Sequence, residues 1–176
     1  LLVERSCYDE VVEIARRAAE ATAVGNPEEE GDHIGPLFDQ IQFDRVQNMI
    51  QVGIDEGATL LVGGLGRPEG FDAGWYVRPT VFSDVNNTMR IAQEEIFGPV
   101  LAIIPFDDEE AAVEIANDTP YGLAAYVQTG SPERAARLSR SLRAGAVHIN
   151  GGAYEYGSPF GGYKASGNGR EGGEMG

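Results

Sequence analysis

Hydrophobic residues recur at helical spacing in two segments of the first third of the chain. Apolar side chains between residues 8 and 19 lie three or four positions apart, which predicts an amphipathic helix that ends before Gly25. Ser6, followed three residues later by an aspartate, predicts a capping-box-like start for this helix. A second amphipathic helix is predicted over residues 39–55, because its apolar positions share one face and Gly57 follows.

Short apolar runs elsewhere predict strands. Residues 1–4 and 59–62 are such runs, and residues 75–82 are expected to be extended. Residues 100–106 form a nearly continuous apolar run, which is typical of a strand buried on both faces of a sheet.

The alternation after that run determines the predicted fold class. The pattern predicts a helix over 109–117, a strand over 124–129, a helix beginning at Pro132 and a strand over 146–150. An Asp-Asp pair precedes the first of these helices and Ser131 the second, as is typical of helix starts. Strands joined by short helical connections pair in parallel with right-handed crossovers. We therefore predict an α/β fold with three αβα layers and a mainly parallel sheet.

Composition and charge narrow the possible partners. The chain has 176 residues, with 28 acidic and 13 basic side chains and a formal net charge of −15. This size suits one domain or one large part of a domain. The acidic excess excludes a general nucleic-acid binder, which needs a clustered basic face, and an anionic membrane surface would repel it. We expect neither nucleic acid nor a membrane as a partner.

Cys7 is the single cysteine, so this chain alone cannot form an intramolecular disulfide or a cysteine-rich zinc site. The sequence shows no signal-peptide pattern and no apolar stretch of about 18 residues, which favours a cytoplasmic location. Cys7 lies near a helix start, where the helix dipole favours a thiolate, but no spacing links His33 or His148 to it as a base. We interpret Cys7 as a structural residue and expect no metal site.

The glycines within residues 167–172 match G-x-G-x-x-G, a pattern of dinucleotide-binding turns. No predicted strand directly precedes them, and this sequence places no acidic residue about 20 positions later. We therefore do not interpret the pattern as a dinucleotide site.

Glu94 and Glu95 are adjacent carboxylates, and Phe97 follows them closely. Neighbouring residues do not face each other on a regular element, so a hydrolase that uses them as an acid and base pair is a weak hypothesis. A single carboxylate beside an aromatic ring can accept hydrogen bonds from the vicinal hydroxyls of a ribose while the ring packs on a flat heterocycle. A solvated surface glutamate is the alternative.

Four segments resemble motifs of the aldehyde dehydrogenase superfamily, in the order in which that family has them. They are Tyr-Val-Arg-Pro-Thr-Val-Phe at 76–82, Glu-Glu-Ile-Phe-Gly-Pro-Val at 94–100, Thr-Pro-Tyr-Gly-Leu-Ala at 119–124 and the glycine-rich stretch at 158–171. The resemblance covers the whole chain, which is similar to the C-terminal part of that family's catalytic domain.

The resemblance implies an enzyme that oxidises an aldehyde to a carboxylic acid with NAD or NADP. A cysteine thiolate attacks the carbonyl, the thiohemiacetal gives a hydride to the nicotinamide, and a glutamate activates water to hydrolyse the thioester. In the family, the catalytic cysteine and the water-activating glutamate precede the segment that matches Leu1. The asparagine whose side chain stabilises the oxyanion and the cofactor-binding domain precede it as well. We therefore expect this chain alone to be inactive. The alternative is a non-catalytic interaction module that retains the fold.

The resemblance assigns four residues of this chain to cofactor binding. Glu95 matches the glutamate that holds the nicotinamide ribose hydroxyls, and Phe97 matches the aromatic residue beside the nicotinamide ring. Gln42 and Arg45 align with positions that reach the cofactor ribose.

Other residues are assigned to the aldehyde side of the site. Phe160 matches a wall of the aldehyde pocket, and Tyr154 and Tyr156 lie in the variable loop before it. Glu171 matches a buried glutamate that serves as a secondary proton relay. Family members continue past the residue that matches Gly176 into a strand that joins a neighbouring subunit. We expect the full-length enzyme to be a homo-oligomer and its substrate to be a small-molecule aldehyde.

Overall fold

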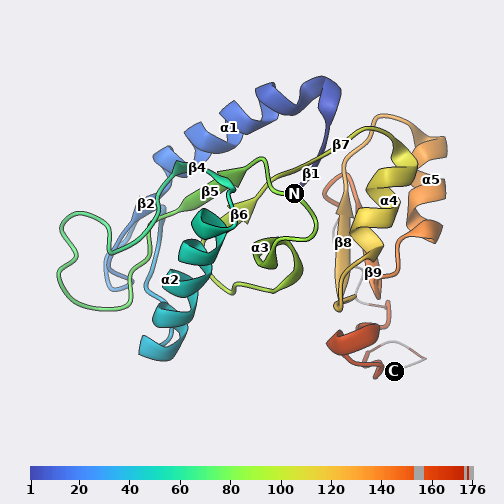
Figure 1. Cartoon of the computed structure of the whole chain (residues 1–176). Helices are drawn as coiled ribbons and strands as arrows, with labels where there is room; N and C mark the ends of the chain where they lie inside the picture. Colours follow the sequence, from blue (N-terminus) through green and yellow to red (C-terminus); the bar gives the residue numbers. More distant parts are fainter. Residues whose placement is uncertain (153–156, 173, 175–176) are drawn as a thin grey trace. The chain divides into compact units, whose positions relative to one another are not determined.

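The computed structural model of the protein describes residues 1–152, 157–172 and 174. The chain divides into two compact units, Leu1–Asp107 and Asp108–Gly176. Figure 1 traces the elements of both units in chain order from blue to red. No helix among these residues is long and apolar enough to span a membrane.

The first unit combines two long helices with short strands and helical turns. Its elements are β1 (Leu2–Glu4), the 3-10 turn η1 (Arg5–Cys7), α1 (Tyr8–Ala21), β2 (Ala23–Val24), β3 (His33–Ile34), α2 (Gln40–Asp55), β4 (Thr59–Val62), β5 (Thr80–Ser83), α3 (Arg90–Gln93), β6 (Val100–Ala102) and β7 (Ile104–Phe106). Strand β5 pairs antiparallel with β4 and parallel with β6, and β1 pairs in parallel with β7 and β2 with β3.

Two helices cover opposite faces of the β4-β5-β6 sheet (Figure 1). Val81 and Phe82 are neighbours in β5, so their side chains point to opposite faces. Val81 belongs to the buried cluster that packs against α1. Phe82 lies under α2, because a Cβ atom added at Gly53 would lie 3.1 Å from its ring. The first unit therefore has the expected three layers.

The apolar run at 100–106 forms two strands rather than the single strand that we predicted. Strands β6 and β7 flank the fully buried Ile103, and they pair with different partners. The Ile103 amide donates to the Phe82 carbonyl at 2.9 Å, while its own carbonyl accepts from the Val85 amide at 3.2 Å. At Ile103 the chain leaves the pairing of β6 with β5 and enters the pairing of β7 with β1.

The predicted starts of three helices are confirmed. The side chains of Asp39, Asp108 and Ser131 accept hydrogen bonds from backbone amides of the first turns of α2, α4 (Glu109–Asn117) and α5 (Pro132–Ser141). Each cap satisfies one of the amides that a helix start leaves without an intrahelical partner.

The predicted cap of the first helix was wrong. Ser6 lies inside the η1 turn and donates to the Glu4 carboxylate at 2.9 Å. Cys7 takes the N-cap position of α1, and its side chain does not cap the helix. The extra turn before α1 moves the helix start past Ser6, and this explains the error.

The second unit contains a strand-helix-strand unit. Strands β8 (Ala124–Val127) and β9 (Ala146–Ile149) pair in parallel, with α5 between them in sequence, and the 3-10 turn η2 (Lys164–Ser166) follows. The predicted parallel pairing of these two strands is confirmed. With β4-β5 as the antiparallel exception among the named strands, the α/β class and the mainly parallel pairing are confirmed as well.

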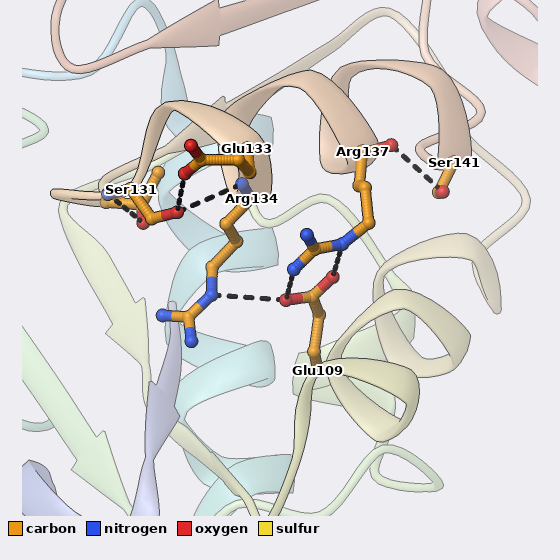
Figure 2. A network of polar contacts seen from close by, with 7 residues as sticks. Glu109, Ser131, Glu133, Arg134, Arg137 and Ser141 are labelled. Atoms are coloured by element: carbon orange, nitrogen blue, oxygen red, sulfur yellow. Dashed lines mark hydrogen bonds and ion pairs between the residues drawn. The ribbon is translucent and has the colours of Figure 1, made fainter.

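Helices α4 and α5 are joined by a charged network. Figure 2 shows the Glu109 carboxylate between two arginines of α5. Arg137 binds it with two hydrogen bonds, at 3.0 and 2.9 Å, and Arg134 adds one at 3.1 Å. Hydrogen bonds from Arg137 hold the pKa of Glu109 below its ordinary value.

Candidate functional site

The segment after α3, residues 95–97, is docked onto α2 through its backbone carbonyl groups. Gln42 lies in the first turn of α2, and its side-chain nitrogen donates to the carbonyl oxygens of Ile96 at 3.0 Å and Phe97 at 2.7 Å. Arg45, one turn further on, donates to the carbonyl oxygen of Glu95 at 2.7 Å. Three consecutive carbonyls are therefore bound by two side chains of one helix face.

Burial alternates along this docked segment. Ile96 is buried, whereas Glu95 and Phe97 on either side of it are exposed, with 68% of the Phe97 surface accessible. The segment thus anchors itself through Ile96 and presents a carboxylate and an aromatic ring to the outside.

Phe97 adopts a left-handed backbone conformation, with φ at 60°. For a residue with a Cβ atom this conformation costs about 1–2 kcal/mol. Such strain persists when the surrounding structure over-determines it, and it clusters at functional sites. Here Gln42 supplies the constraint, because it binds the carbonyl group before the φ and ψ angles of Phe97 and the carbonyl group after them.

Glu94 does not form an acid and base pair with Glu95. Its carboxylate binds Arg90 with hydrogen bonds at 2.8 and 3.3 Å, and this hydrogen bonding lowers the pKa of Glu94. A carboxyl group held ionised in this way is a poor general acid. The hydrolase hypothesis gains no support from the structure.

The docked segment has the chemistry that a nucleoside needs. An ionised carboxylate accepts hydrogen bonds from vicinal hydroxyls, and an exposed ring packs on a flat heterocycle. The sequence led us to Glu95 and Phe97 for this reason. It missed that Gln42 and Arg45 bind the backbone of the same segment, because these partners are 50 to 55 positions apart in the chain. Their contact with a cofactor stays a prediction.

In the second unit, Phe160 and Glu171 are paired through their main chains. The Phe160 amide donates to the Glu171 carbonyl at 2.7 Å, and the Glu171 amide donates back at 2.8 Å. Phe160 is 45% exposed, as a pocket wall requires. Glu171 itself is exposed in this chain, and its relay role stays a prediction. Tyr154 and Tyr156 lie outside the described residues.

Hydrogen bonds join the motif at 119–124 to the glycine-rich stretch at 158–171. The Gly122 carbonyl accepts from the Tyr163 amide at 2.9 Å, and its amide donates to the Ser166 hydroxyl at 3.1 Å. Lys164 donates from Nζ to the carbonyls of Asn117 at 2.7 Å and Thr119 at 2.9 Å. These bonds fix the base of the loop that carries Phe160.

The other candidates do not assemble into a site among the described residues. The Cys7 thiol is exposed and donates to the Glu4 carbonyl at 3.4 Å, while His33 binds the Asn26 carbonyl. His148 stacks on Tyr126. No group of residues that can hold a metal ion is found in the part of the chain that the structure describes.

The comparison with known proteins decides the family. The model of the aldehyde dehydrogenase family matches residues 1–176. This chain belongs to the aldehyde dehydrogenase family. It is 51% identical over 176 residues to a 3-succinoylsemialdehyde-pyridine dehydrogenase from Pseudomonas sp, a match that covers 100% of this chain and 37% of the relative. The chain therefore spans little more than a third of the length of this curated relative.

Solved aldehyde dehydrogenases share the fold of this family member. An aldehyde dehydrogenase from Bartonella henselae has a TM-score of 0.97 and 50% identity, covering 99% of this chain and 37% of its own. A mutant of aldehyde dehydrogenase C from Pseudomonas syringae, complexed with NAD+ and octanal, has a TM-score of 0.95 and 50% identity, covering 99% of this chain and 36% of its own. The resemblance inferred from the four motifs is confirmed.

Proposed function

We propose that this chain is the C-terminal part of the catalytic domain of an NAD- or NADP-dependent aldehyde dehydrogenase. The whole polypeptide converts an aldehyde and water to a carboxylic acid, and the two electrons leave as a hydride. The observation that carries the proposal is the docked segment, in which Glu95 and Phe97 are exposed on either side of the buried Ile96.

Glu95 and Phe97 are the residues that would hold the cofactor in this part of the enzyme. When bound, the oxidised nicotinamide supplies the hydride acceptor. The Glu95 carboxylate accepts hydrogen bonds from the ribose hydroxyls, and the Phe97 ring limits the movement of the flat nicotinamide. The solved relative that contains NAD+ and octanal supports a nicotinamide cofactor and an aldehyde substrate.

The glycine-rich loop of the second unit is proposed to contribute to binding of the aldehyde. Phe160 offers an apolar wall of a substrate pocket, and the Glu171 bridge fixes its backbone. Tyr154 and Tyr156 are proposed to adjust the choice of aldehyde. The relay role of Glu171 stays a prediction.

The nucleophile is proposed to lie outside these 176 residues. Cys7 is the only cysteine in the chain, and the structure gives it an exposed position next to the Glu4 carbonyl rather than next to a base. We therefore propose that the chain is inactive by itself, and that the full-length enzyme is a cytoplasmic homo-oligomer.

Aldehyde oxidation by two polypeptides tests the proposal. The full-length polypeptide that carries this chain is expected to form NADH or NADPH from octanal, also as the Cys7→Ala variant. The isolated 176 residues are expected to form none. Turnover by the isolated chain that Cys7→Ala abolishes would place the chemistry here instead. A full-length polypeptide that neither binds NAD+ or NADP+ nor oxidises aldehydes would indicate an interaction module.

A further inference from the structure

The carbonyl groups of Ile96 and Phe97 converge on one nitrogen atom, Nε2 of Gln42. In an extended backbone, successive peptide units alternate in direction, whereas in a helical backbone successive carbonyls point the same way. One nitrogen can bind both oxygens only if the backbone turns at the residue between them. That residue is Phe97, whose φ is 60°.

We propose that Gln42 is a positioning residue that holds Phe97 in its left-handed conformation and thereby sets how Glu95 and Phe97 meet the nicotinamide riboside. This inference rests on the proposed function. It assigns Gln42 a different task from direct contact with the ribose, which the family resemblance implies.

The donor count of the side chain supports this assignment. A carboxamide has two N–H groups, and the Gln42 side-chain nitrogen makes two hydrogen bonds to carbonyls of this chain. Donation to a cofactor hydroxyl would require one of these bonds to open. Arg45 differs, because its guanidinium has five N–H groups and uses one of its nitrogens on the Glu95 carbonyl.

A side-chain nitrogen also bridges two carbonyl groups elsewhere in the chain. The Lys164 ammonium donates to the carbonyls of Asn117 and Thr119. A lysine ammonium can therefore bridge two carbonyl groups. Gln42→Lys is expected to restore the hydrogen bonds that a Gln42 variant without N–H donors loses.

The experiment uses the full-length polypeptide that carries this chain. Gln42→Met keeps the side-chain length and removes both donors, and Gln42→Lys restores donors. The matched control is Gln51→Met on the same helix, where the Gln51 side chain donates to Asp55 of its own helix at 2.7 Å. The first measurement is cleavage of the cofactor-free polypeptide by a glutamate-specific protease, with mass spectrometry of the fragments that end at Glu94 or Glu95.

Gln42→Met is expected to raise cleavage at these two glutamates several-fold and to slow single-turnover hydride transfer by about 10- to 100-fold, as for a misplaced reaction partner. The dissociation constant of NAD+ is expected to change less than the hydride-transfer rate. Gln42→Lys is expected to recover most of both effects, and Gln51→Met is expected to show neither. If Gln42→Met does not fold, Gln42→Asn keeps the amide but shortens its reach by one methylene, and the same changes are expected.

Three results would overturn the proposal. One is a folded Gln42→Met variant with unchanged cleavage. Another is increased cleavage with unchanged hydride transfer, which would make the contact structural only. The third is an NAD+ affinity that falls as much as the hydride-transfer rate, as direct cofactor binding requires. A wild-type polypeptide without aldehyde oxidation would refute the proposed function instead, and the protease comparison would still decide whether Gln42 holds the segment.

Discussion

Gly98 lies directly against the side chain of Val46, a fully buried residue of α2. A Cβ atom at position 98 would lie 2.7 Å from Cγ2 and 3.1 Å from Cγ1 of Val46, closer than carbon atoms approach. The absence of a side chain at Gly98 therefore lets the carbonyls before it come within hydrogen-bond distance of Gln42 and Arg45.

Gly98→Ala is expected to push the docked segment away from α2. We expect a loss of about 1–3 kcal/mol in the free energy of unfolding, as for overpacking in a closed site. Urea denaturation measures it. Gly130→Ala is the matched control, because a Cβ atom there meets nothing within 4 Å. A loss at position 98 no larger than at position 130 would mean that the contact with Val46 relaxes freely.

Tyr8→Phe is expected to destabilise the junction between α1 and β5. The Tyr8 hydroxyl accepts from the Asp84 amide at 2.7 Å, and Asp84 has a positive φ of 54°. Removing this acceptor is expected to cost about 1–2 kcal/mol, which thermal or urea unfolding measures. Tyr126→Phe removes the hydroxyl of a tyrosine that is 76% exposed and serves as the control. Equal stability of the two variants would contradict the role of the hydrogen bond.

The Glu109 network predicts a pH dependence of stability. Hydrogen bonds from Arg137 lower the pKa of Glu109 in the folded state below its unfolded value, which is about 4.3. The stabilisation is therefore present above that unfolded value and is lost as the pH falls through the lower folded pKa. Glu109→Gln is expected to lose less stability than the wild type on acidification below about pH 5.

Urea midpoints measured across this pH range test the Glu109 prediction. Glu110→Gln changes a neighbouring exposed glutamate in the first turn of the same helix and is the control. Parallel acid profiles for wild type and Glu109→Gln would show that the arginines of α5 do not stabilise the fold through this carboxylate.

The sequence predicted features that depend on neighbours along the chain. The caps at Asp108 and Ser131 were predictable because the capping side chain and the amide it binds are three residues apart. The break at Ile103 was not, because an apolar run carries no information about which strand each half will pair with. The Ser6 error has a local origin, since a short turn moved the N-cap of α1 from Ser6 to Cys7.

The candidate site shows the same limit. Glu95 and Phe97 were found because a carboxylate and a ring lie close together in one motif. The hydrogen bonds from Gln42 to the Ile96 and Phe97 carbonyls were missed because these partners lie 54 and 55 positions away in the chain. At that separation the sequence pattern does not indicate which residues are in contact. The relay role of Glu171 was inferred from the resemblance alone, and it stays a prediction.

Single-turnover formation of NADH by the full-length Glu95→Gln variant tests the central claim most directly. If Glu95 orients the nicotinamide ribose, hydride transfer slows by about 10- to 100-fold, while thioester hydrolysis changes less. Glu94→Gln, which removes the exposed contact with Arg90, is expected to stay within about twofold of the wild type. A Glu95→Gln variant that forms NADH at the wild-type single-turnover rate would contradict the account.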